Sequence, residues 1–225
     1  MPLKRFHKVN SIFVIFPPGC GGNHLSNLLS FLPNVSGRFS SNTYFHDMVL
    51  KYHKLSQGAD IVAHFSDLEN LQKEQLDMHL DRILKSEDKY VFCAHADEYI
   101  YTMQMYKKLF ANKKKMYFLM SEPTLKNEVV FWRRRGYWMQ PDTLERYYDL
   151  YNPKGFLRNV SDPKSIIPIN TDLFYTIDGF DYLQSVLKEN INHMLPSICK
   201  ELHTIYIRNK TEFIQSQKVD RKTES

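Results

Sequence analysis

The stretch Ser11–Phe31 constrains this chain most, because it joins an apolar run to an amphipathic run through a glycine-rich turn. Ile12–Phe16 is a short apolar segment typical of a buried strand, and leucines recur at helical spacing from Leu25 onward. Two prolines and then Gly19-Cys20-Gly21-Gly22 separate the two runs. The pattern predicts a strand, a glycine turn and a helix in succession.

A turn of this composition is suited to an anion. Glycines lack a Cβ, so successive backbone N–H groups can point into one concavity. The first amides of the following helix add partial positive charge at the same place. A tight corner that only packs the strand against the helix is the alternative, and a plain helix cap is the alternative for Asn23. The residues expected to hold a phosphate are Gly19, Cys20, Gly21, Gly22, Asn23 and His24.

The composition is that of a soluble protein with an ordinary core. The chain has 225 residues, of which 43% are hydrophobic and 24% charged, so one domain is expected. The formal net charge of +5 suits an anionic ligand but falls short of a nucleic-acid-binding signature. The three cysteines lack the CxxC spacing of a zinc site and do not form an even disulfide framework. No metal site is expected, and a reducing compartment is favoured.

The sequence predicts no targeting signal. The basic N-terminal stretch lacks the apolar segment of a signal peptide. No run approaches the ~20 apolar residues that a membrane helix needs. We therefore expect a cytoplasmic protein without a membrane partner. Its domains are predicted as one α/β transferase domain over residues 1–217 and a charged flexible tail over 218–225.

Predicted strands and helices alternate along the chain, whereas Pro33–Thr43 is rich in Ser, Asn and Gly and predicts a loop. Alternation of this kind predicts an α/β three-layer sandwich with a mostly parallel central sheet and helices on both faces. Pro168 marks the last strand as an edge strand or a strand end. Strands are expected at Ile12–Phe16, Ile61–Phe65, Tyr90–His95, Met116–Met120 and Ser165–Asn170, and helices at Asp67–Lys85, Asp97–Phe110, Thr124–Arg135, Asp142–Leu150, Phe180–Met194 and Ser197–Gln215.

Ligands of such folds lie beyond the carboxyl ends of the strands. The glycine turn ends the first predicted strand, His95 ends the third, and Ser121 follows the fourth. These residues are therefore expected to line one crevice.

The turn and the segments around it resemble the P-loop sulfotransferases. Pro18, Gly21 and Leu25 match the proline, glycine and helix leucine of the loop that binds the 5′-phosphosulfate in that family. Pro123 matches the proline of the segment that binds the donor's 3′-phosphate. The last strand, followed by a helix and by Glu201-Leu202-His203, is similar to divergent members.

The sequence departs from the family where charge is needed. Gly19 lies where the family has its loop lysine, Cys20 where it has a serine, and Gly22-Asn23 where it has two threonines. Ser121 replaces the 3′-phosphate arginine, and Val129 falls at the serine position. Lys126 and Arg133–Arg135 are candidates to replace the missing basic groups, or they form a solvated helix end.

The resemblance implies transfer of a sulfuryl group from phosphoadenosine phosphosulfate to a hydroxyl or amine acceptor. A base of near-neutral pKa suits removal of the acceptor's proton. His95 at the end of a strand is the candidate base, and Asp97 is the candidate to orient the imidazole or to act itself. A histidine that only satisfies its own hydrogen bonds is the alternative.

Two other functions stay open. A P-loop kinase would use a nucleoside triphosphate and Mg²⁺, but the turn has no lysine, and no hydroxyl follows the glycines before Ser26. A catalytically inactive phosphate-binding module is favoured by the missing lysine and arginine. The partners expected are a nucleotide donor and an acceptor that the sequence does not identify.

Overall fold

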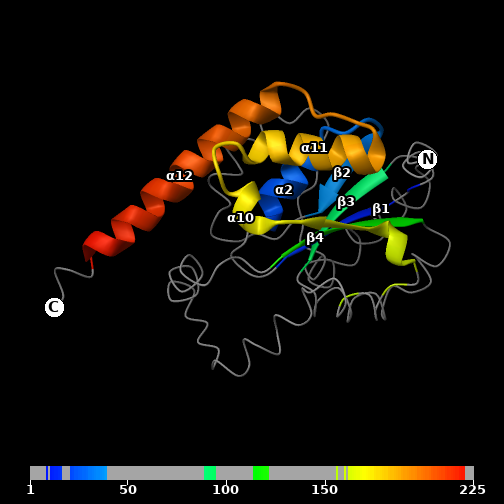
Figure 1. Cartoon of the computed structure of the whole chain (residues 1–225), viewed down its shortest axis with the longest axis horizontal. Helices are drawn as coiled ribbons and strands as arrows, with labels where there is room; N and C mark the ends of the chain where they lie inside the picture. Colours follow the sequence, from blue (N-terminus) through cyan, green and yellow to red (C-terminus); the bar gives the residue numbers. More distant parts are fainter. Residues whose placement is uncertain are drawn as a thin grey trace, which may run out of the picture.

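A computed structural model of the chain describes residues 9, 11–16, 21–39, 89–94, 114–121, 156, 160 and 162–220 (Figure 1). Within these residues the strands are β1 (Ser11–Ile15), β2 (Val35–Phe39), β3 (Lys89–Ala94), β4 (Lys115–Met120) and β5 (Ile166–Ile169). The helices are α2 (Gly22–Leu29), the short 3₁₀ helix η3 (Pro163–Ser165), α10 (Thr171–Phe174), α11 (Gly179–Ile191) and α12 (Ile198–Asp220).

The five strands form one sheet in the order β2-β3-β1-β4-β5, and every pair of neighbours is parallel. This confirms the predicted α/β class and the parallel sheet. The strand β1 lies at the centre, with Ser11 beside Tyr90 of β3 on one side and beside Lys115 of β4 on the other. All five of its residues are buried, as expected of a central strand covered on both faces.

One face of the sheet carries the main hydrophobic core. Alternate strand residues such as Val14, Cys93 and Phe118 lie in one buried cluster with Leu25 and Leu28 of α2. The same cluster includes apolar residues of α10, α11 and the first part of α12. Figure 1 shows α2 and α11 on this face, while α12 continues past the sheet toward the C-terminus.

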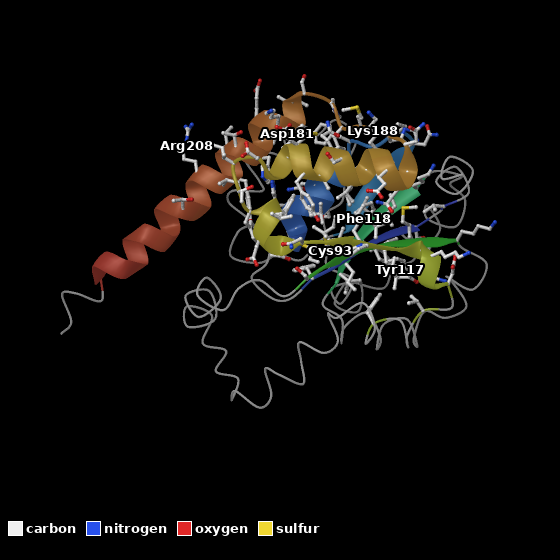
Figure 2. All side chains as sticks on the ribbon, viewed as in Figure 1. Cys93, Tyr117, Phe118, Asp181, Lys188 and Arg208 are labelled. Atoms are coloured by element: carbon white, nitrogen blue, oxygen red, sulfur yellow. The ribbon has the colours of Figure 1, made fainter. Side chains whose placement is uncertain are left out.

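The opposite face carries a row of aromatic rings. Phe13 stacks on Phe92 and on Tyr117, with ring centroids 5.1 Å and 5.5 Å apart, and Tyr117 meets Phe156 edge-on at 5.7 Å. All four rings are buried. Tyr117 and its neighbour Phe118 point to opposite sides of β4, as the two-residue period of a strand requires (Figure 2).

The strands expected on these residues are confirmed within one position, except at β2, and the helix expected at Phe180–Met194 is confirmed but ends three residues earlier. The structure has strands at 11–15, 89–94, 115–120 and 166–169, and a helix at Gly179–Ile191. Pro168 lies in β5, which is an edge strand, as its missing N–H predicts. The last helix runs to Asp220, five residues beyond the predicted end, so residues 218–220 of the expected tail are helical.

The prediction of a loop over Pro33–Thr43 is wrong, because β2 lies within it. The strand sequence VSGRF has one glycine and two polar residues, which obscure the alternation of a strand. It pairs as the other edge of the sheet, with a register shift between Val35 and Gly37. The strand Ile61–Phe65 and the four helices predicted between residues 67 and 150 lie outside the described residues.

Ile12 and Ile177 form a matched pair that tests the core. Ile12 in the central strand is 0% exposed, whereas Ile177 is 68% exposed. Ile12→Ala should lower the free energy of unfolding by about 2–5 kcal/mol, because it removes buried methyl groups and leaves a cavity. Ile177→Ala should change it by less than about 0.5 kcal/mol. Urea denaturation of both variants measures the difference, and equal effects would contradict the described core.

Candidate functional site

The residue that precedes α2 adopts a left-handed backbone. Gly21 is the N-cap of α2 with φ 68° and ψ 29°, a conformation that favours glycine. The helix begins without a hydrogen bond from a capping side chain and with no acidic residue in its first turn. No carboxylate of this turn therefore opposes the positive end of the helix dipole.

The carbonyl group of Gly21 closes the first turn of α2. Its oxygen accepts hydrogen bonds from the amides of His24 and Leu25, at 2.9 Å and 3.1 Å. The amide of His24 is thus used by the helix itself. The backbone donors that can face a ligand at this helix start are those that precede His24.

Two tyrosine hydroxyls lie against Gly21. A Cβ placed on this residue would overlap the hydroxyl oxygens of Tyr175, which follows α10, and of Tyr206, which lies in α12. Both oxygens therefore sit beside the Cα of the turn. The site combines a glycine that admits no side chain with two hydroxyl groups that can donate or accept.

The first turn of α2 also packs directly on the sheet. A Cβ on Gly22 would overlap the ring of Phe16, which follows β1. The thiol of Cys93 in β3 donates to the carbonyl oxygen of Gly22 at 3.7 Å. These contacts hold the first turn of α2 against the carboxyl ends of β1 and β3.

The side chain of His24 faces the C-terminal helix. Its ring is 1% exposed and stacks on Tyr206, with centroids 3.8 Å apart and an angle of 8° between the planes. Its Nε2 lies 3.1 Å from Nδ1 of His203 in α12. The imidazole expected at a bound oxyanion is thus engaged with α12, and its role toward a ligand stays a prediction.

His203 completes a buried pair of imidazoles. It is 0% exposed, and its Nε2 lies 3.2 Å from the carbonyl oxygen of Thr176. Burial lowers the pKa of His203, while the backbone carbonyls of Thr176 and Phe174 act in the opposite direction. Since a carbonyl only accepts, Nε2 of the neutral ring carries the proton, and Nδ1 accepts from Nε2–H of His24.

A second cluster joins the ends of β4 and β5. Ser121 donates its amide to the carbonyl of Ile169 at 2.8 Å, and its Oγ accepts from the amide of Thr171 at 3.1 Å. The Thr171 hydroxyl donates to the carbonyl of Ser121. Because Oγ of Ser121 acts here as an acceptor, its own proton is not used by these bonds. Ser121 is half-buried.

The topology of the sheet places both clusters at related positions. The chain leaves β1 toward the β2 edge, whereas it leaves β4 toward the β5 edge, and β1 and β4 are neighbours. The connections therefore diverge between the carboxyl ends of these two strands. This is where ligands of open α/β sheets bind. Gly21 follows one strand and Ser121 the other.

Five of the predicted site residues are described. Gly21, Gly22, Asn23 and His24 lie together at the start of α2, and Ser121 follows β4. The other candidates, Gly19, Cys20, His95, Asp97, Lys126 and Arg133–Arg135, lie outside the described residues.

Sequence reasoning did not single out Thr171, Tyr175 or Tyr206, and it noted His203 only through the resemblance. One face of α12 could have been recognised from the helical spacing of its residues, all of which are buried: Cys199, Leu202, His203 and Tyr206. Tyr175 follows a four-residue helix and leaves no such pattern.

Neither a comparison with protein-family models nor a comparison with curated proteins finds a match for this chain. Among the residues that the structure describes, no group of three or more His, Cys, Asp or Glu side chains is arranged to hold a metal ion. Within the same residues, no helix has the length and apolar character needed to cross a membrane.

Gly21→Ala tests the junction. It should lower the free energy of unfolding by about 2–5 kcal/mol, because a left-handed non-glycine residue costs about 1–2 kcal/mol and overlap with the tyrosine hydroxyls adds to it. The matched control is Asn192→Ala, at an exposed left-handed position with φ 55°. Its loss should be about 1 kcal/mol, from backbone strain alone. Equal losses in the two variants, measured by denaturant unfolding, would contradict the packing of the hydroxyls on Gly21.

The buried imidazole pair predicts a pH dependence of stability. The pKa of His203 is lowered in the folded protein, so the unfolded chain binds the proton more readily. The free energy of unfolding should therefore fall as the pH falls below the unfolded value of about 6.5. His203→Asn should flatten this dependence between about pH 7.5 and about pH 5.5. An unchanged slope in the variant would show that His203 does not titrate as its burial requires.

Proposed function

We propose that this chain is a sulfotransferase-like transferase that holds the phosphate end of a phosphoadenosine phosphosulfate-type donor at the start of α2. The observation that carries the proposal is the left-handed Gly21, the N-cap of α2, which is the first described helix after the central strand β1. It lies where the connections of a parallel sheet diverge, and this is the position at which such sheets bind phosphates.

The residues present fit a phosphorylated donor. Gly21 admits no side chain, and the hydroxyls of Tyr175 and Tyr206 lie beside it. The helix dipole of α2 has no carboxylate in its first turn to compete with an anion. When bound, the donor supplies an activated sulfuryl group. In this proposal the backbone amides before His24 would hold its phosphate, and the hydroxyl of Ser121, which follows β4, would donate its proton to it.

The state of Ser26 favours this chemistry over a kinase. In Mg²⁺-dependent P-loop enzymes a hydroxyl that follows the loop binds the metal ion. Ser26 provides the first hydroxyl after the glycines, but it is 0% exposed and donates to the carbonyl of Asn23 at 2.9 Å. The hydrogen bond turns its proton toward α2, and the burial of Ser26 keeps its oxygen away from an ion in solvent. A transfer that needs no loop-bound metal is the better match.

The proposed general base comes directly after β3 in the sequence, and β3 pairs with β1. Ala94, the last residue of β3, lies beside Ile15, the last residue of β1. His95 comes next in the chain, so the proposal gives it the proton of the acceptor hydroxyl or amine, with Asp97 orienting the imidazole. The proposal also keeps a three-layer arrangement for the whole domain, since both faces of the described sheet are buried.

Thermal shift with single nucleotides tests this function. Adenosine 3′,5′-bisphosphate at 100 times its Kd should stabilise the protein by about 2.7 kcal/mol without added Mg²⁺. ATP and GTP should give no Mg²⁺-dependent response. Gly21→Val should abolish the response by filling the turn, whereas Ser26→Ala should retain it. The unliganded melting temperature of each variant shows whether it folds.

Three results would contradict the proposal. A response to ATP or GTP that requires Mg²⁺ and disappears in Ser26→Ala would indicate a kinase. Binding of adenosine 3′,5′-bisphosphate without sulfuryl transfer to any hydroxyl or amine acceptor would indicate a non-catalytic phosphate-binding module. A melting temperature that none of the three nucleotides changes would rule out a donor of the phosphoadenosine phosphosulfate type.

A further inference from the structure

The C-terminal helix α12 contacts the start of α2 at several atoms. Tyr206 stacks on the ring of His24 with centroids 3.8 Å apart, and its hydroxyl lies against Gly21. His203, one turn earlier in α12, lies 3.1 Å from Nε2 of His24. The two helices are 179 residues apart in sequence at this contact. The start of α2 is thus packed between the sheet below it and α12 beside it.

The hydrogen bonds of His203 point in two directions. Its Nε2–H donates to the carbonyl of Thr176, in the segment between α10 and α11. Its Nδ1 accepts from His24, the third residue of α2. A Cβ on Gly179 would lie 2.8 Å from Nε2 of His203, so the ring also fits closely against the start of α11. His203 therefore connects the start of α2 to the turn before α11.

We propose that His203 is a positioning residue for the anion-binding turn and that it acts through His24. The amide of His24 donates to the carbonyl of Gly21, so the orientation of His24 is tied to the left-handed junction. Its imidazole donates a hydrogen bond from Nε2 to Nδ1 of His203 and stacks on the ring of Tyr206. Removing the hydrogen bond leaves a buried N–H donor and loosens this turn before it loosens the rest of the fold. The effect of His203 on ligand binding rests on the proposed function, whereas its effect on the first turn of α2 does not.

Two substitutions separate the bonds that His203 makes. In His203→Asn the amide group occupies the place of Nδ1 and can still accept from His24, but nothing reaches Thr176. In His203→Gln the longer side chain reaches the place of Nε2 and can still donate to Thr176, but it no longer offers an acceptor to Nε2–H of His24. A residue with only a packing role would make the two variants equivalent. If His203 positions the turn through His24, His203→Asn should preserve the turn, whereas His203→Gln should not.

Amide hydrogen exchange on the unliganded protein tests the proposal. The amides of His24 and Leu25 report the first turn of α2, and the amide of Phe118 in β4 serves as an internal reference for global unfolding. In His203→Gln, protection of the first two amides should fall by about tenfold relative to the reference. In His203→Asn it should stay within about twofold of wild type. Equal loss in both variants, or a larger loss in His203→Asn, would overturn the positioning role.

Calorimetric titration with adenosine 3′,5′-bisphosphate adds the functional part. His203→Gln should bind it about tenfold more weakly than wild type, and His203→Asn should bind within about twofold. Equal affinities of the two variants would overturn the link between the turn and the ligand. If the wild-type protein does not bind this nucleotide, the proposed function fails, and the exchange pattern still decides whether His203 positions the turn.

Discussion

The rest of this structure depends on how the start of α2 is held. A left-handed glycine opens the helix, and a second glycine lets it rest on the ring of Phe16. On the opposite side, the hydroxyl of Tyr206 lies on Gly21 and its ring lies on His24. Side chains larger than hydrogen fit at neither glycine, because the neighbouring rings already occupy the space. The turn is therefore shaped by its packing as much as by its own backbone preference.

The parallel sheet gives this turn its place in the fold. Because β1 is central, its carboxyl end lies between the carboxyl ends of β3 and β4, where ligands of such sheets bind. Ser121 is fixed there by Thr171, which joins β4 to the start of α10. The arrangement concentrates backbone donors and hydroxyl groups at one end of the sheet.

Much of the fold follows from local sequence, and the missing parts have physical reasons. β1 and β4 are continuous apolar runs, so they were predictable, and the need for glycine at Gly21 followed from the turn. The strand β2 was not predictable from local sequence, because its residues form a strand only through pairing with β3 at the edge of the sheet. The contact of His24 with α12 joins residues that no local pattern relates, so the sequence did not predict this contact, and the role of the imidazole toward a ligand stays a prediction.

The central claim is that the amides at the start of α2 bind the phosphate of a nucleotide donor. The most direct measurement is a titration of the ¹⁵N-labelled protein with adenosine 3′,5′-bisphosphate, followed through the backbone amide resonances. The account predicts that the largest saturable shifts occur at Gly21, Gly22 and Asn23, with smaller ones at Tyr206 of α12, whose hydroxyl lies against Gly21. Saturable shifts elsewhere with none at these three amides, or no shifts at all, would contradict it.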